Sequence, residues 1–146
     1  ESIRQEMEQK ERKAMELANQ TADIIFPGEQ QPESDHGIRY EQAETGTNKD
    51  RHFRRAKGWF GYTLKTSKEA SRLMITTRKN DPMKVVILLN NEKLTAAPTI
   101  SETDQEGFVI LCYPLPQKLG AGNYPIRFSP DGTEWTPAIY EIRLLE

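Results

Sequence analysis

The side chains best suited to chemistry are concentrated in residues 34–64. This segment holds both histidines of the chain, four of its arginines and one of its two tryptophans. Asp35 next to His36, with His52 further along, could form a metal site or a base with a carboxylate that orients it. Zinc sites usually use tighter ligand spacings, and no third ligand follows in the sequence. We therefore expect His36 to be hydrogen-bonded in a loop, with neither a metal nor a cofactor bound.

The sequence also has no clear signature of a hydrolase. A glycosidase needs two carboxylates that flank the scissile bond, but acids are so frequent between residues 29 and 50 that their presence is no evidence for such a pair. The chain also lacks the G-x-S-x-G, P-loop, H-E-x-x-H and EF-hand patterns. The single cysteine, Cys112, lies in the apolar run F-V-I-L-C-Y and is expected to be a buried thiol. We therefore expect no catalytic residue in this chain.

A basic and aromatic group, R-H-F-R-R, spans residues 51–55 and could hold phosphate or carbohydrate. A formal net charge of −2 argues against nucleic acid as a partner. The favoured interpretation is that Arg51 and Arg54 pair with acids of the same segment, such as Glu44, and so fix a long loop. The candidates for this structural network, or for an interface built on it, are Asp35, His36, Glu41, Arg51, His52 and Arg54.

The two tryptophans lead to different expectations. Trp59 opens a strand beside Phe60, so we expect it in the core. Trp135 follows the polar turn S-P-D-G-T-E, and an aromatic ring in an exposed turn can stack on a sugar. Packing at a strand end is the interpretation that we favour for Trp135. Trp135 and Arg55 are nevertheless the candidate carbohydrate contacts.

The elements that must position these groups are one helix and a set of strands. Residues 2–19 have a helical pattern with a thin apolar face, which indicates a surface connector rather than a part of the core. No apolar run reaches the ~18 residues of a membrane helix, so no membrane insertion is expected. The expected organisation is a helix or linker over residues 1–20 and a single β-sandwich domain over residues 21–146.

After residue 21 the apolar period changes from that of a helix to that of strands. We expect residues 29–35 to be an extended loop and Pro125 to place its strand at a sheet edge. The fold class that this pattern predicts is mainly β, a β-sandwich of the jelly-roll or galactose-binding type with an N-terminal helix. About eight strands are expected, over residues 23–26, 59–64, 73–77, 85–89, 93–95, 108–113, 124–128 and 139–145.

The order of residues from 35 to 64 also resembles a known family. The pattern is D-H-x-I, then E, T-G and R-x-x-R-x-A-x-G-W-F-x-Y-x-L, formed here by Asp35, His36, Ile38, Glu41, Thr45-Gly46, Arg51, Arg54, Ala56, Gly58-Trp59-Phe60, Tyr62 and Leu64. It resembles the C-terminal β-sandwich domain, long catalogued as a domain of unknown function, of β-L-arabinofuranosidase-like glycoside hydrolases of family 127. Phe53 stands where that family often has tryptophan.

The resemblance implies a fragment of a periplasmic or extracellular enzyme that degrades polysaccharides, although no signal peptide opens the chain. Hydrolysis in that family belongs to an upstream helical domain with a glutamate and zinc-held cysteines, so no catalytic residue carries over. Residues 1–20 would then be the tail of, or the strut to, a missing upstream catalytic domain.

Three functions follow from this reasoning, in order of preference. The leading hypothesis is a non-catalytic C-terminal accessory domain that packs against the catalytic domain of the same polypeptide, with contact to plant-type or arabinose-containing glycan as a further option. The alternative is an autonomous carbohydrate-binding module, and the third is an independent hydrolase. Exposure separates the first two, because a module needs solvent-facing aromatic rings whereas a docking domain needs residues 34–58 folded into an interface or an internal network.

Overall fold

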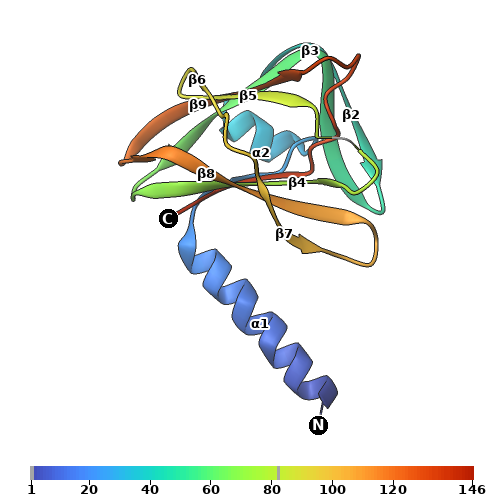
Figure 1. Cartoon of the computed structure of the whole chain (residues 1–146), viewed down its shortest axis with the longest axis vertical. Helices are drawn as coiled ribbons and strands as arrows, with labels where there is room; N and C mark the ends of the chain where they lie inside the picture. The colour runs from blue at the N-terminus through green and yellow to red at the C-terminus, as the bar shows by residue number, and fades with distance from the viewer. Residues whose placement is uncertain (1, 82) are drawn as a thin grey trace.

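A helix projects from two packed β-sheets in the computed structural model, which describes residues 2–81 and 83–146 (Figure 1). The elements are α1 (Ser2–Gln20), β1 (Thr21–Ile25), α2 (Gln30–Asp35), β2 (Arg39–Asn48), β3 (Arg51–Thr66), β4 (Ala70–Arg78), β5 (Val85–Leu89), β6 (Glu92–Lys93), β7 (Thr99–Thr103), β8 (Phe108–Leu119), β9 (Gly122–Pro130) and β10 (Glu141–Leu145). Neither helix of these described residues has the length and hydrophobicity that crossing a bilayer requires.

The strands form two antiparallel sheets that face each other. The β4 sheet has the order β1-β10-β4-β8-β7, and the β3 sheet has the order β2-β3-β9-β5-β6. Both sheets combine strands from distant parts of the chain, so neither can form from one local segment. The predicted mainly-β sandwich with an N-terminal helix is confirmed.

Alternating side chains of the facing strands form the core. In β3, Phe60 and Leu64 are fully buried, and the Phe60 ring stacks on Phe128 of β9 with 5.0 Å between ring centroids. Leu73 of β4 and Ile142 of β10 close the core from the other sheet and are also fully buried. Burying each such side chain contributes about 1.5–3 kcal/mol, so this apolar layer fixes which face of each sheet turns inward.

A long hairpin precedes this core and was not predicted. The expected strand began at Trp59, but β3 begins at Arg51 and pairs with β2 along its whole first half. Lys49 and Asp50 connect the two strands with φ values of 53° and 64°, the left-handed conformation that tight hairpin turns require. The polar composition of residues 39–55 suggested a loop because both strands have exposed faces.

Residues 29–35, which were predicted to be an extended loop, contain the helix α2. Pro32 lies in the first turn, where the N–H that proline lacks would have no partner within the helix. The helix ends at Asp35, and Gly37 follows with a φ of 64°. In the view of Figure 1, α2 lies between the ribbons of the two sheets; its Glu33 is buried, whereas Gln30, Gln31, Ser34 and Asp35 are exposed. The proline was therefore a helix-starting signal rather than a loop signal.

Pro125 was predicted to lie in an edge strand, but β9 lies between β3 and β5. The Pro125 carbonyl accepts a hydrogen bond from the Asn90 N–H at 2.8 Å. In a strand the N–H and the carbonyl of one residue point to the same side, so an N–H at residue 125 would also point toward Asn90. Asn90 lies in the turn after β5, outside the paired part of the sheet. The missing donor therefore costs no hydrogen bond of the sheet, and proline is tolerated in a central strand here.

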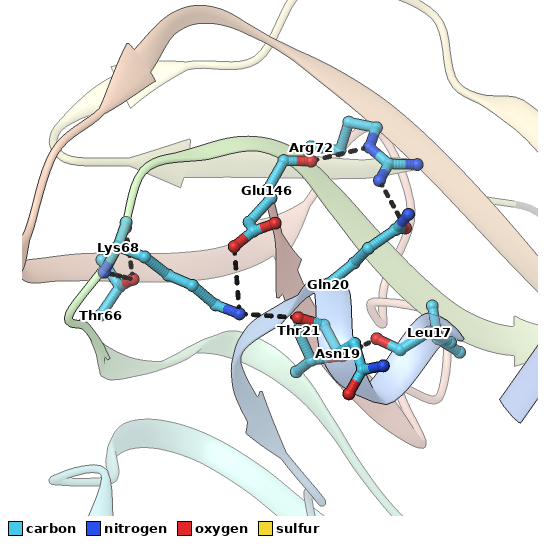
Figure 2. Close-up of polar contacts among 8 residues, drawn as sticks. All are labelled: Leu17, Asn19, Gln20, Thr21, Thr66, Lys68, Arg72 and Glu146. Carbon is cyan, nitrogen blue, oxygen red and sulfur yellow. Dashed lines mark hydrogen bonds and ion pairs between the residues drawn. The ribbon is translucent and has the colours of Figure 1, made fainter. Parts of the chain in front are cut away.

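Helix α1 is attached to the sandwich only at its last turn. The Lys68 ammonium donates to the Asn19 carbonyl at 2.8 Å and pairs with Glu146 at 3.2 Å (Figure 2). Arg72 joins the Gln20 side chain to the Glu146 carbonyl. These groups are largely exposed, so each contact contributes little to stability.

Removing α1 should leave the sandwich folded. Between residues 3 and 20 only Leu17 is even half-buried, and Ile3, Met7 and Met15 are 72, 59 and 67% exposed. We expect a chain that begins at Thr21 to unfold cooperatively, with a melting temperature within about 5 °C of the full chain's. Thermal unfolding followed by circular dichroism measures this, and loss of the cooperative transition would mean that α1 completes the core.

Candidate functional site

The first group of polar residues is a buried cluster formed by Glu33, Arg54 and Tyr62. The Arg54 guanidinium donates from Nε to Glu33 Oε2 at 2.6 Å and from Nη2 to Oε1 at 2.9 Å. The Tyr62 hydroxyl donates to the same Oε2 at 2.6 Å. The three residues are only 5, 8 and 3% exposed, respectively. The carboxylate on α2 is thus tied to two positions on the inner face of β3.

Charge pairing keeps this cluster ionised despite its burial. Burial by itself raises the pKa of Glu33, but the hydrogen bonds from Arg54 and Tyr62 outweigh it and hold that pKa below its usual range. Burial and the adjacent carboxylate raise the pKa of Tyr62. In the described part of the chain no buried side-chain nitrogen or oxygen lacks a partner. The carboxylate and the hydroxyl are thus engaged within the cluster, which fixes α2 against β3.

Arg54 was expected to pair with Asp35, Glu41 or Glu44, and it pairs with none of them. Asp35 is exposed and accepts a hydrogen bond from Gln31. Glu41 is exposed and lies opposite Trp59 in the register of β2 and β3. The alternation of β3 explains the difference, because Arg54 points inward and reaches only the acid that α2 brings between the sheets.

Arg51 and His52, the other basic side chains of the predicted network, also lie apart from the buried Glu33 cluster. Arg51 approaches Glu141 at 3.8 Å, and its guanidinium lies 4.6 Å above the centre of the Phe108 ring. His52 is exposed. The neighbouring Arg55 pairs with Glu44 at 2.6 Å on the exposed side of the hairpin. Residues adjacent in sequence therefore serve different faces of the sheet.

His36 forms a second tie beside the cluster. Its Nδ1 lies 2.7 Å from the Pro32 carbonyl oxygen and its Nε2 lies 2.9 Å from Asp23 Oδ1 of β1. Both ring nitrogens face acceptors, so the doubly protonated ring fits this position. The hydrogen bond to Asp23 raises the pKa of His36, and burial opposes it without reversing the direction.

The His36 tie should make stability depend on pH. The pKa of His36 in the folded state lies above its ordinary value of 6.5. The stability that the charged ring contributes is therefore complete below pH 6.5 and is lost as the pH rises through the raised pKa. Urea unfolding at about pH 5.5 and about pH 8.5 should show that His36→Gln destabilises the protein more at the lower pH. An equal effect at both values would mean that the ring acts by packing alone.

The second group of polar residues lies on the outer face of the β3 sheet, the face turned away from the β4 sheet. Phe60 points inward, so its neighbour Trp59 points outward and is half-buried. The Arg127 guanidinium of β9 lies 3.9 Å from the centre of the Trp59 ring. Trp59 was predicted to lie in the core, and that prediction was wrong because only one of two successive strand residues can face inward.

A row of paired residues crosses three strands and has one arginine on each side of a glycine. Arg39 of β2 lies opposite Gly61 of β3, and Gly61 lies opposite Arg127 of β9. Residues directly opposite each other share a face, and two strand spacings separate the arginine Cα atoms by roughly 10 Å. The glycine leaves the position between the two arginines in this row without a side chain.

This row lies in a hollow of about 220 Å³ on the outer face. Trp59, Leu88 and Pro125 offer apolar surface, whereas Asn91, Thr63 and the two arginines offer hydrogen-bonding groups. The lining residues are Gly37, Arg39, Trp59, Gly61, Tyr62, Thr63, Leu88, Asn91, Pro125, Ile126 and Arg127. No aspartate, glutamate or histidine is among them, so the hollow has the composition of a binding site and lacks the paired carboxylates of a glycosidase.

The predicted carbohydrate contacts lie further along the same face. The Arg55 guanidinium lies 4.4 Å and the Lys57 ammonium 5.3 Å from the centre of the Trp135 ring. Arg55 and Lys57 alternate with Trp59 along β3 and point the same way. Arg55 and Lys57 are paired with Glu44 and Glu134. Trp135 therefore lies beside the part of β3 that precedes the hollow.

Residues that could hold a metal ion do not gather in the described parts of the chain. No group of three or more histidine, cysteine, aspartate or glutamate side chains has a suitable arrangement there. Sequence reasoning missed Glu33, Arg39 and Arg127 as site residues. Only the alternation of β3 and β9 could have indicated the outward direction of Arg127 and Trp59.

The fold is similar to that of carbohydrate-binding modules. A family 35 carbohydrate binding module from Clostridium thermocellum matches with a TM-score of 0.57 and 13% identity, over 84% of this chain and 98% of the module. A family 35 module from Cellvibrio japonicus matches with a TM-score of 0.58 and 12% identity, over 84% and 93% of the two chains. The catalytic unit of an α-1,3-glucanase from Streptomyces thermodiastaticus matches with a TM-score of 0.53 and 12% identity, over 86% of this chain and 26% of that one. At these identities the likeness shows a shared fold.

No curated protein matches this chain. A family match, in contrast, covers nearly all of the sequence. It extends over residues 16–145, which include the last turn of α1 and both sheets. The chain belongs to DUF6805, a family of unknown function.

Proposed function

We propose that this chain is a non-catalytic glycan-binding accessory domain, and that glycan binds in the hollow on the outer face of the β3 sheet. The observation that carries the proposal is the outward-facing Trp59, which holds the Arg127 guanidinium in a hollow that Arg39 also lines and that no carboxylate lines. Sugars present apolar C–H faces and hydroxyl groups, which match an aromatic wall and N–H donors respectively. The similarity in fold to carbohydrate-binding modules supports the same function.

The stacking of Arg127 on Trp59 prepares the hollow for binding. A guanidinium held over an indole ring loses less conformational freedom when it binds a ligand. Trp59 thus forms one wall and also holds a donor in place. Trp135 and Arg55 serve in this proposal as a second contact, which only a longer glycan reaches.

We also propose the accessory role that the resemblance to family 127 implies. Here α1 connects the sandwich to a catalytic domain of the same polypeptide, which acts in the periplasm or outside the cell on plant-type or arabinose-containing glycan. The exposure of Ile3, Met7 and Met15 supports this role, because these side chains offer apolar surface to a neighbouring domain. The hydrogen bonds at the end of α1 support it by fixing the helix to the sandwich (Figure 2).

Retention in native gels that contain polysaccharide tests the binding function. We expect the full chain to be slowed by at least one of arabinan, galactan, xylan and polygalacturonate. Trp59→Ala should abolish the retention, because it removes the wall and releases Arg127; stacking on one sugar is worth about 10-fold or more in affinity. A matched change in the other tryptophan, Trp135→Ala, should weaken retention by long polysaccharide but leave binding of a trisaccharide unchanged.

Two results would contradict the proposal. If no polysaccharide slows the full chain, glycan binding is wrong. If Trp59→Ala keeps its retention and its melting temperature while Trp135→Ala loses retention, the hollow is not the binding site.

A further inference from the structure

We propose that the hollow selects acidic glycans, with the anionic group of one sugar bound between Arg39 and Arg127. This inference rests on the proposed glycan-binding function and names the class of ligand. The two arginines lie on either side of Gly61 in one row of the sheet, so both can reach a group placed above the glycine. A planar guanidinium donates two parallel hydrogen bonds to a carboxylate or a sulfate.

The absence of carboxylate partners for Arg39 and Arg127 in the described part of the chain supports the inference. Within residues 2–81 and 83–146, neither Arg39 nor Arg127 forms an ion pair, whereas Arg54 and Arg55 both do. The chain has 22 acidic and 20 basic residues, so potential partners are plentiful. An anion bound between the two arginines would supply the counterion that neither has within the described residues.

The surroundings of the hollow restrict where the anion can bind. Glu41 lies opposite Trp59 on the same face but is not among the lining residues, so a carboxylate borders the hollow at one side. Arg55 and Lys57 are neutralised by Glu44 and Glu134. Among these four basic residues of the face, Arg39 and Arg127 are therefore the two without a carboxylate partner in the described residues, while the apolar walls remain available to the ring of the same sugar.

Matched ligands test the selectivity directly. Isothermal titration calorimetry of the full chain would compare polygalacturonate with its methyl ester, and dextran sulfate with dextran. In at least one of the two pairs, we expect the charged polymer to bind at least about 10-fold more tightly than the neutral one. That preference should shrink as sodium chloride rises, because salt screens exposed charges. The pair that shows the preference identifies the anion as carboxylate or sulfate.

Matched variants test the residues. Arg39→Gln and Arg127→Gln should each lower affinity for the charged polymer about 10-fold and affinity for its neutral counterpart by clearly less, so that the ratio of the two affinities falls. Arg12→Gln, on exposed α1, makes the same change of charge away from the hollow and should have no effect. Melting temperatures of the variants would verify that each is folded.

The outcomes separate this inference from the function on which it rests. Equal binding of charged and neutral glycan would overturn the acidic preference and leave glycan binding in place. Equal binding of polyglutamate would show general attraction to polyanions and would also overturn the preference. If no glycan of either kind binds, the proposed function fails, and the preference fails with it.

Discussion

Glu33→Gln is expected to lower the free energy of unfolding by about 3–5 kcal/mol. The change removes the charge that neutralises Arg54 while leaving the guanidinium buried, and an uncompensated buried charge is among the most destabilising changes in a protein. For a domain of this size the melting temperature should fall by about 10–15 °C. Urea unfolding and calorimetry measure the two quantities.

The expected size follows from how completely the cluster is enclosed. Arg54 uses two nitrogens on Glu33, and Tyr62 uses its hydroxyl on the same carboxylate. With its oxygen in the place of Oε2, a glutamine can still accept from Arg54 Nε and from the Tyr62 hydroxyl, but its own N–H₂ then faces Arg54 Nη2. The variant therefore loses one hydrogen bond and places two donors face to face, in addition to losing the charge.

Glu44→Gln is the matched control, because it removes a carboxylate that pairs with the neighbouring Arg55 on the exposed side of β3. This exposed pair should contribute less than about 1 kcal/mol. A triple variant, Glu33→Leu with Arg54→Met and Tyr62→Phe, removes every polar member and should recover much of the lost stability. If Glu33→Gln costs no more than Glu44→Gln, water reaches the cluster and the structural role assigned to it is wrong.

The sequence allowed the inward faces of several strands to be predicted but not the partners of buried polar groups. In β9, the alternation of apolar and polar residues predicts that Tyr124, Ile126 and Phe128 point inward. Ile126 and Phe128 are buried and Tyr124 is partly buried against the core. Glu33 could not be singled out from the other acids near it. Its burial depends on the packing of α2 against the inner face of β3, which a polar sequence of six residues does not reveal.

The candidate binding site was predictable in part. Once Phe60 is placed inward, alternation requires Trp59 to face outward, and the preference of tryptophan for cores should have been set aside. The row of Arg39, Gly61 and Arg127 could not be predicted. It arises from the pairing of β2, β3 and β9, and register between strands that are distant in sequence is decided by the whole fold.

Gly61→Ala is expected to destabilise the protein by about 3 kcal/mol, although it adds only one methyl group. A Cβ at this position would lie 2.5 Å from the Ile126 carbonyl oxygen and 3.3 Å from the Arg127 Cα. Both are backbone atoms of a central strand, so no side chain can rotate to make room. The β3 and β9 strands would have to separate where they position the hollow.

Gly120→Ala is the control for the general effect of replacing glycine. A Cβ there meets no atom within 4 Å, and the residue lies at the turn between β8 and β9. Its free energy of unfolding should stay within about 1 kcal/mol of the unmodified chain's, since alanine restricts the unfolded state at little cost to the folded one. If Gly61→Ala is as stable as Gly120→Ala, the two strands are not held as closely as the structure indicates. The spacing of Arg39 and Arg127 across the hollow would then be adjustable, and selection for an anion between them would lose its geometric basis.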